Sequence, residues 1–203
     1  MVKTLQTEDR ILITAREVFI AEGYDGARMQ HIADKAGINK SLLHYYYRTK
    51  ENLFTAVFER VFNEIMSRIF SLVESEESLE NLIRIFFREH IGFLLEQPRL
   101  PAFFISESSL HPGLLSSVFK KFGTRGIKKF SDLVDMEKKA GKIDDNLDPR
   151  QLLINILSLS IFPIAIRPIF KDVFSLSDAE TEDLLRRRME LLPVMVLASL
   201  YNK

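Results

Sequence analysis

The chain has 203 residues, of which 46% are hydrophobic and 28% charged, and it contains no cysteine. This composition predicts a globular protein of one large domain or two small ones, and it excludes disulfides and thiolate metal sites. Lys and Arg together number 28, as do Asp and Glu, so the formal net charge is zero. Any basic surface for nucleic acid must therefore be local.

The N-terminal residues are charged, which excludes an apolar signal segment there. The longest uncharged run, residues 151–166, is shorter than the ~20 apolar residues that span a bilayer. We therefore expect a soluble, cytoplasmic protein with no membrane partner.

Apolar residues recur with helical spacing along nearly the whole chain, and we expect an all-α fold. The breaks at glycine, proline and acidic residues divide the chain into segments. The expected helices cover residues 7–23, 28–37, 39–47, 50–73, 79–95 and 101–110, a stretch from the break at 111–113 to 140, and residues 149–166 and 178–201. The acidic residues 74–80 predict a turn.

Several helix starts carry clear capping signals. Asn39 precedes the third segment, and Asp148 is followed by a proline at the first helical position. Ser177 and Glu180 have the spacing of a capping box. Gly23 and Gly37 are expected to end the first and second helices.

The segments 28–37 and 39–47 are two short helices joined by a turn, which is the layout of a helix-turn-helix. In that motif the second helix enters the DNA major groove. Tyrosines here can stack on sugars, and Lys40 and Lys50 can neutralise phosphates. The residues expected to contact DNA are Arg28, Asn39, Lys40, Ser41, Leu42, His44, Tyr45, Tyr46 and Lys50.

Residues 11–53 contain the segments AREVF (15–19), EGY (22–24), IADKAGI (32–38), LHYYY (43–47) and TKENL (49–53). They resemble the DNA-binding domain of TetR-type (tetracycline-repressor-like) transcriptional regulators. The resemblance implies an N-terminal three-helix helix-turn-helix domain over 1–60. It further implies a helical effector-binding and dimerisation domain over 61–203.

The chain departs from the family pattern at positions that affect the choice of operator. Arg28 stands where the family usually has a Ser or Thr that caps the second helix, and Ser41 replaces a usual Gly or Ala. His44 replaces a usual Tyr, and Tyr47 a usual Phe. Leu42, often a hydroxyl residue in relatives, is suited to contact a thymine methyl group.

The resemblance also implies an apolar small-molecule effector and a homodimer formed through the helices near 149–166 and 178–201. Both helices carry apolar stripes, which face either a second subunit or the protomer's own core. The candidate effector-binding residues are Phe86, Phe87, His90, Phe103, Phe104, Glu107, Phe122, Phe162 and Arg167. The expected function is a ligand-responsive repressor that binds an inverted-repeat operator, with the effector altering the spacing of the two recognition helices.

Two alternatives stay open at this point. One is a helical partner-binding dimer whose helix-turn-helix has lost DNA binding, suggested by Arg28 and Ser41. The other is a helical enzyme in which His90, Glu107 and Ser106 or Ser108 form a hydrolytic site. No recognised catalytic or metal-binding motif is present, so we expect no catalytic residues, no metal and no cofactor.

Overall fold

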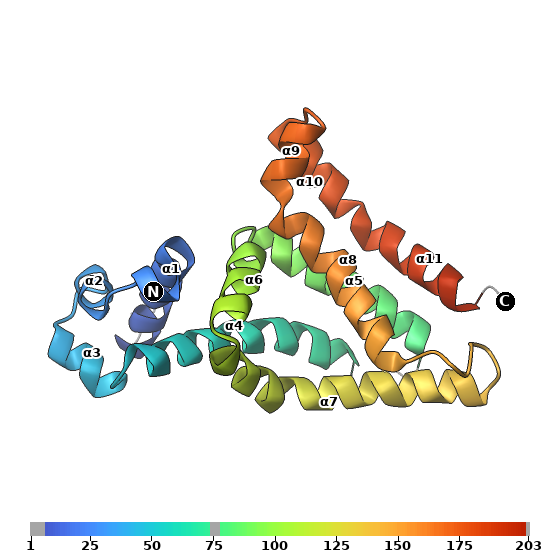
Figure 1. Ribbon diagram of the computed structural model, residues 1–203, viewed down its shortest axis with the longest axis horizontal. Coiled ribbons are helices and arrows are strands. Elements are labelled where there is room, and N and C mark those ends of the chain that lie inside the picture. The colour runs from blue at the N-terminus through green and yellow to red at the C-terminus, as the bar shows by residue number, and fades with distance from the viewer. Residues whose placement is uncertain (1–6, 74–77, 202–203) are drawn as a thin grey trace, which may run out of the picture. The chain divides into compact units, whose positions relative to one another are not determined.

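The computed structural model describes residues 7–73 and 78–201, except for the side chains of residues 65, 66, 68–73, 122, 123 and 125. All regular secondary structure in these ranges is helical, which confirms the all-α prediction (Figure 1). The helices are α1 (Thr7–Gly26), α2 (Met29–Lys35), α3 (Lys40–Tyr46), α4 (Lys50–Val73), α5 (Leu79–Glu96), α6 (Leu100–Leu110), α7 (Pro112–Lys139), α8 (Pro149–Ala165), α9 (Arg167–Val173), α10 (Asp178–Arg186) and α11 (Arg188–Tyr201).

The predicted caps are present. The Asn39 carboxamide oxygen accepts a hydrogen bond of 2.7 Å from the Leu42 amide at the start of α3. The Asp148 carboxylate accepts the Arg150 amide at 2.8 Å, with Pro149 in the first turn of α8. Ser177 and Glu180 bond reciprocally in a capping box. Each of these side chains satisfies an amide that the first helical turn leaves unpaired.

Three boundaries differ from the prediction. The expected last helix is divided at Arg187 into α10 and α11, and the short helix α9 follows α8. In α1 the helix breaks at Gly23, as predicted, where the backbone takes φ 71° and ψ 173°, and helical residues then continue to Gly26. Of the predicted turn at 74–80, residues 74–77 lie outside the described residues.

The chain forms two compact units, each assembled from separate segments. Unit 1 comprises Met1–Glu64 and Phe103–Lys121, and unit 2 comprises Ile65–Ala102 and Phe122–Lys203. The boundary near residue 64 lies close to the division expected at residue 60. However, most of α6 and the first part of α7 group with the N-terminal segment, because aromatic side chains hold them there.

The core of unit 1 is a chain of aromatic rings. Phe54 is fully buried, and its ring meets that of Phe19 edge-on at a centroid separation of 5.0 Å. Phe58 packs against Phe54 at 4.6 Å and against Phe103 of α6 at 5.4 Å. Rings of this size contribute a large part of a core's stability.

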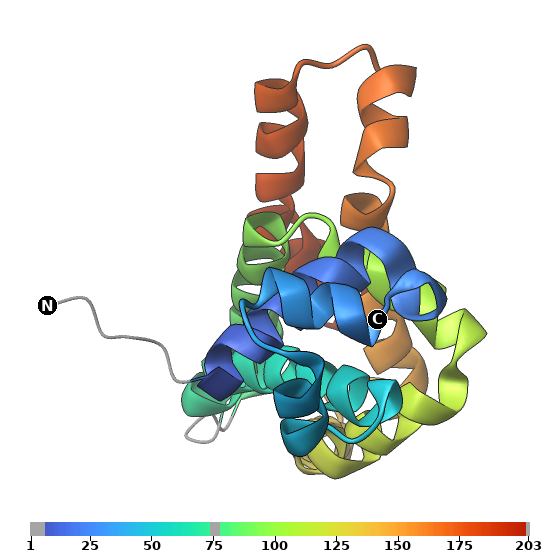
Figure 2. The same ribbon diagram turned by 90° about the vertical axis from the view of Figure 1, so that its left-hand side faces the viewer.

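Unit 2 is built around α5, which packs against α8, α10 and α11. The helices α9 and α10 lie side by side, joined by a short loop, as Figure 2 shows near its upper edge. Within the described residues no single helix is long and apolar enough to cross a membrane. Taken together, α8 and α9 have the length and composition of a membrane-spanning segment, but the pair is bent by 65° at the break between them.

Candidate functional site

The helix-turn-helix of α2 and α3 is held by buried apolar residues. Ile32 and Ala33 of α2 and Leu43 of α3 are fully buried, and the two helices pack against each other. Gly37 in the turn has φ 66°, a left-handed conformation that a residue with a side chain rarely adopts. The glycine therefore permits the tight turn that sets the angle between the two helices.

The other face of α3 carries the residues predicted to contact DNA. Tyr45 is 81% exposed, and its ring meets that of Tyr46 edge-on at 5.6 Å. Lys40 and Ser41 are exposed in the first turn of α3, and Leu42 is half-buried behind them. These residues provide adjacent cationic, hydroxyl and aromatic groups, a combination suited to phosphates, sugars and base edges.

Two further predicted DNA-contacting residues, His44 and Arg28, lie at helix ends. The His44 Nδ1 lies 3.1 Å from the Arg48 carbonyl oxygen, and because a carbonyl only accepts, Nδ1 carries the proton. Arg28 is exposed at the N-cap of α2 and makes no side-chain capping bond there, as the departure from the family pattern predicts.

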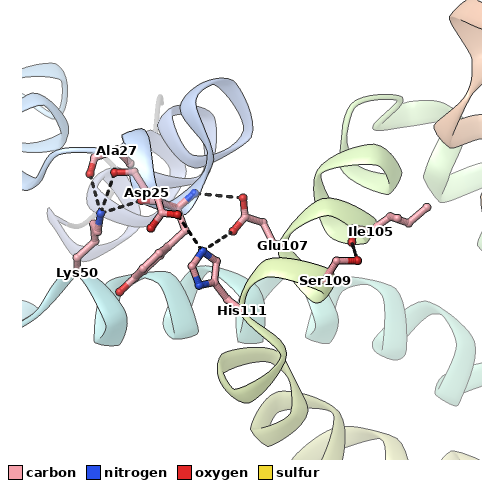
Figure 3. Close-up of polar contacts among 8 residues, drawn as sticks. Asp25, Ala27, Lys50, Ile105, Glu107, Ser109 and His111 are labelled. Carbon is pink, nitrogen blue, oxygen red and sulfur yellow. Dashed lines mark hydrogen bonds and ion pairs between the residues drawn. The ribbon is translucent and has the colours of Figure 1, made fainter.

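The structure gives Lys50 a different role from the predicted phosphate contact. Its ammonium group donates to the carbonyl oxygens of Tyr24, Asp25 and Ala27 at 2.8, 3.3 and 3.2 Å, as Figure 3 shows. It also lies 4.5 Å from the centre of the Tyr24 ring. Three acceptors use all three ammonium protons. Lys50 therefore caps the end of α1, and its predicted contact with phosphate stays a prediction.

Glu107 of α6 is also part of unit 1, where it holds the end of α1. It is only 3% exposed, and its Oε1 accepts the Tyr24 amide at 3.2 Å (Figure 3). The His111 Nε2 lies 3.8 Å from the Glu107 Oε2 and 3.5 Å from the Asp25 carboxylate. A Cβ added at Gly23 would stand 3.2 Å from Glu107 Oε1. The glycine thus allows the close approach of α6 to α1.

The candidate effector residues fall into both units. Phe103, Phe104 and Glu107 belong to unit 1, where the two rings pack against Phe58 at 5.4 and 5.6 Å. The candidates in unit 2 are Phe86, Phe87, His90, Phe162 and Arg167. Phe122 is in α7, but its side chain lies outside the described residues.

Within unit 2 these candidates differ sharply in environment. Phe87 is fully buried in the core, whereas Phe162 is 53% exposed on α8. Phe86 stacks obliquely on His90 at 4.8 Å. The Arg167 guanidinium donates to the Asp178 carbonyl at 3.4 Å, a contact between α9 and α10. Among these five, Phe86 and His90 contact each other directly at one place in the helical bundle.

His90 is buried and makes a hydrogen bond that defines its tautomer. Its Nδ1 lies 3.0 Å from the Ser160 hydroxyl oxygen of α8. Ser160 uses its own hydrogen on the Leu157 carbonyl at 3.0 Å, so the His90 Nδ1 must donate. Burial lowers the pKa of His90 to about 4, which makes the ring neutral at pH 7. The residue bonds to Ser160, not to the serines of the hypothetical hydrolytic site.

This buried histidine predicts a loss of stability in mild acid. The pKa of His90 is about 4 in the folded chain and near 6.5 when unfolded. Protons therefore bind preferentially to the unfolded chain as the pH falls from about 6.5 to about 4. The free energy of unfolding should drop by about 3 kcal/mol from this residue over that window.

Urea unfolding of the protein and of His90→Asn, at pH 7 and at pH 4.5, measures this contribution. We expect the wild type to lose more stability than the variant between the two pH values. An equal loss in both proteins would contradict the assignment of a neutral, buried His90.

Sequence reasoning missed two polar contacts between helices. One is the contact of Glu107 with the Tyr24 amide, which joins residues far apart in the chain. The other is Arg188, whose side chain crosses from α11 to a carbonyl of α8. No local sequence pattern predicts either contact, because in each one the side chain bonds a backbone group far away in the sequence. In the described part of the chain, His, Asp and Glu form no group of three or more suited to a metal ion.

Known proteins resemble this chain over nearly its full length. The family described as "Bacterial regulatory proteins, tetR family" matches residues 11–57, and "Tetracyclin repressor-like, C-terminal domain" matches residues 76–196. The HTH-type transcriptional repressor NicS of Pseudomonas putida is 25% identical over 164 residues, covering 77% of this chain and 75% of that protein. The transcriptional activator FasR of Mycolicibacterium smegmatis is 38% identical over 60 residues, 30% of this chain and 27% of FasR.

Solved structures share the fold. FadR from Bacillus subtilis, determined in complex with stearoyl-CoA, superposes with a TM-score of 0.68 at 16% identity, covering 91% of this chain and 97% of that one. The C-terminal family match alone covers more than half of the chain, and the N-terminal match coincides with the helix-turn-helix described above. This chain therefore belongs to the tetR family and is a DNA-binding transcriptional regulator.

Proposed function

We propose that the protein is a ligand-responsive repressor that acts in the cytoplasm and binds an inverted-repeat operator as a homodimer. The observation that carries the DNA-binding part is the exposed face of α3, with Lys40, Ser41, Tyr45 and Tyr46 on a helix whose other face is buried. In this assignment α3 enters the major groove. We propose repression and not activation because NicS, which is named a repressor, matches a longer part of this chain than the activator FasR does.

Within α3 the proposed contacts divide by chemistry. Lys40 and Arg28 supply cations for phosphates, and Tyr45 and Tyr46 stack on sugars and donate their hydroxyls. We assign Ser41, Leu42 and the Nε2 of His44 to contacts with base edges. Asn39 contributes by capping α3, which holds its first turn at the groove. No residue in this set is assigned a catalytic role.

The homodimer is supported by apolar side chains that one subunit leaves uncovered. They lie on α8, α9, α10 and α11 or at the C-cap of α9, and are each 43–67% exposed: Ile154, Phe162, Ile169, Val173, Phe174, Leu184, Leu191, Val194 and Met195. Large exposed apolar residues gathered on a few elements mark interaction surfaces. A second copy using the same surface gives the two-fold symmetry that an inverted repeat requires.

The response to an effector is assigned to α6. This helix begins within unit 2, at Leu100–Ala102, and continues in unit 1 from Phe103. Its residue Glu107 bonds the Tyr24 amide at the end of α1. A ligand in the helical domain that favours one position of the first turn of α6 therefore biases the end of α1. Such coupling requires unequal binding of the ligand to the two conformations.

Lys40→Met and Lys50→Met form a matched pair that tests the DNA interface. We expect Lys40→Met to weaken binding and to lower the slope of log affinity against log salt by about 0.9 for each phosphate that is no longer neutralised. Lys50→Met should leave that slope unchanged and lower the melting temperature, because three carbonyl oxygens lose their donor.

Fluorescence anisotropy with DNA flanking the protein's own gene, at two salt concentrations and with nonspecific competitor, measures both slopes. Specific binding that survives the competitor supports the repressor. A protein that binds no DNA at low salt would instead favour the helical partner-binding dimer. A changed slope in Lys50→Met would support the predicted phosphate contact of that residue.

A further inference from the structure

Arg188 is held at the start of α11 by an unusual acceptor. Its Nη2 donates to the Leu159 carbonyl oxygen of α8 at 3.1 Å. Inside an α-helix that carbonyl would accept from the amide four residues later, but this position is Pro163, which has no amide hydrogen. Arg188 therefore supplies the donor that Pro163 removes. This bond uses only one of the five N–H groups of the guanidinium.

The rest of the Arg188 guanidinium lacks a counter-charge. Its Nε is buried with no hydrogen-bond partner, and desolvation lowers the pKa of the group. The preceding Arg186 and Arg187 bond the carboxylates four residues earlier, Glu182 and Asp183, at 2.8 and 2.7 Å. The corresponding residue for Arg188 is Leu184. None of the ion pairs found among the described residues includes Arg188, so this half-buried cation of unit 2 has no counter-charge among them.

The same part of α8 also contacts His90, whose Nε2 is a neutral hydrogen-bond acceptor. Arg188 bonds the carbonyl of Leu159, and the next residue, Ser160, bonds His90 of α5. Because the Nδ1 of His90 donates to Ser160, its Nε2 carries a lone pair, and no hydrogen bond of the described structure uses it. The helices α5, α8 and α11 pack against one another here. Between them they present one unpaired cation and one unused neutral acceptor.

We propose that Arg188 binds the carboxylate of an apolar carboxylic acid that acts as the effector. The inference rests on the proposed function, because it names the chemical class of its ligand. The planar fork of a guanidinium matches the two oxygens of a carboxylate. One cation balances one carboxylate, whereas a phosphate dianion needs more positive charge than this place supplies. The Phe86 ring, which stacks on His90, offers apolar surface for the ligand body.

The Arg188 Nε is covered by its own chain, so a ligand carboxylate would meet the part of the half-buried guanidinium that remains exposed. Binding there pairs a charge that the free protein leaves uncompensated, which favours the occupied state.

The test compares decanoate with decan-1-ol, which share an apolar chain and differ in charge. The variants are Arg188→Met, which keeps much of the length of the side chain, and Arg187→Met, a control that removes a neighbouring surface arginine. Calorimetric titration should show that the wild type and Arg187→Met bind decanoate about tenfold or more tighter than decan-1-ol. Arg188→Met should lose this preference and keep its affinity for the alcohol.

A second readout follows the unpaired atom itself. In the ¹⁵N–¹H spectrum of the full-length protein, decanoate should shift the Arg188 Nε–H resonance, identified by its absence from the Arg188→Met spectrum. Decan-1-ol should not shift it. Equal affinities of the wild type for the two probes, or binding of neither, would overturn the proposal. So would a carboxylate preference retained in a folded Arg188→Met protein.

The proposed function has a separate test, so the two can fail independently. Specific operator binding is measured without any effector and does not depend on Arg188. If operator binding is specific but decanoate shows no preference for Arg188, only the carboxylate site is rejected. If decanoate binds through Arg188 but no operator is bound, the repressor proposal is rejected and the ligand site stands.

Discussion

Replacement of Leu191 by glutamate should convert a dimer into a monomer and weaken operator binding on the order of a thousandfold. Leu191 is 52% exposed on α11, close in sequence to the exposed Val194 and Met195. A carboxylate at the centre of an apolar interface would be buried without a partner, which costs more than the interface gains. A monomer would contact one half-site only, and its affinity would approach that of nonspecific binding.

Analytical ultracentrifugation and anisotropy on the same preparations measure both effects. Met136→Glu serves as a control, because Met136 is 58% exposed on α7, which is not one of the helices proposed to dimerise. We expect the Met136 variant to remain dimeric with unchanged affinity. A Leu191→Glu protein that stays dimeric would move the interface away from α11. A monomeric variant that still binds the operator tightly would disprove the need for two helix-turn-helix motifs, one from each subunit.

Replacement of Phe54 by alanine should destabilise unit 1 by about 3–5 kcal/mol, which is the usual cost of removing a fully buried phenylalanine. The Phe54 ring contacts Phe19, Tyr24, Phe58 and Phe103, with centroid distances between 4.6 and 6.3 Å. Its removal leaves a cavity at the point where α1, α4 and α6 meet. Because α1 supports the helix-turn-helix, operator binding should fall together with stability.

Urea unfolding monitored by circular dichroism measures the change in free energy. The control is Ile13→Ala, since Ile13 is 39% exposed on α1, and a surface change of this kind is usually worth less than about 0.5 kcal/mol. Phe54→Leu, which refills part of the cavity, should recover a portion of the loss. Equal stability of Phe54→Ala and Ile13→Ala would contradict the ring cluster as the core of unit 1.

Local signals predicted the helices well where a side chain completes a backbone bond. Asn39, Asp148 and Ser177 begin helices at the expected positions, because capping depends on residues only two or three apart. The break between α10 and α11 was not predicted. It falls at Arg187, in a run of three arginines that contains neither glycine nor proline.

The candidate site likewise has features that the sequence predicted and one that it did not. The exposed face of α3 follows from helical spacing, and the structure leaves Tyr45 and Lys40 exposed as expected. The role of Lys50 could not be predicted, because its partners are three carbonyl oxygens more than twenty residues earlier in the chain. Sequence reveals that a lysine is charged, but only the fold shows which oxygens surround it.

The discontinuous make-up of unit 1 has a consequence for how the protein is synthesised and dissected. On the ribosome, α5 emerges before Phe103–Lys121. Unit 1 therefore cannot be completed until a segment that follows part of unit 2 has been translated. A fragment that stops near residue 64 would carry all of α2 and α3 yet lack Phe103, the ring that packs on Phe58. Such a fragment should aggregate or bind DNA weakly. We expect an independently folding DNA-binding fragment to include the segment through residue 121.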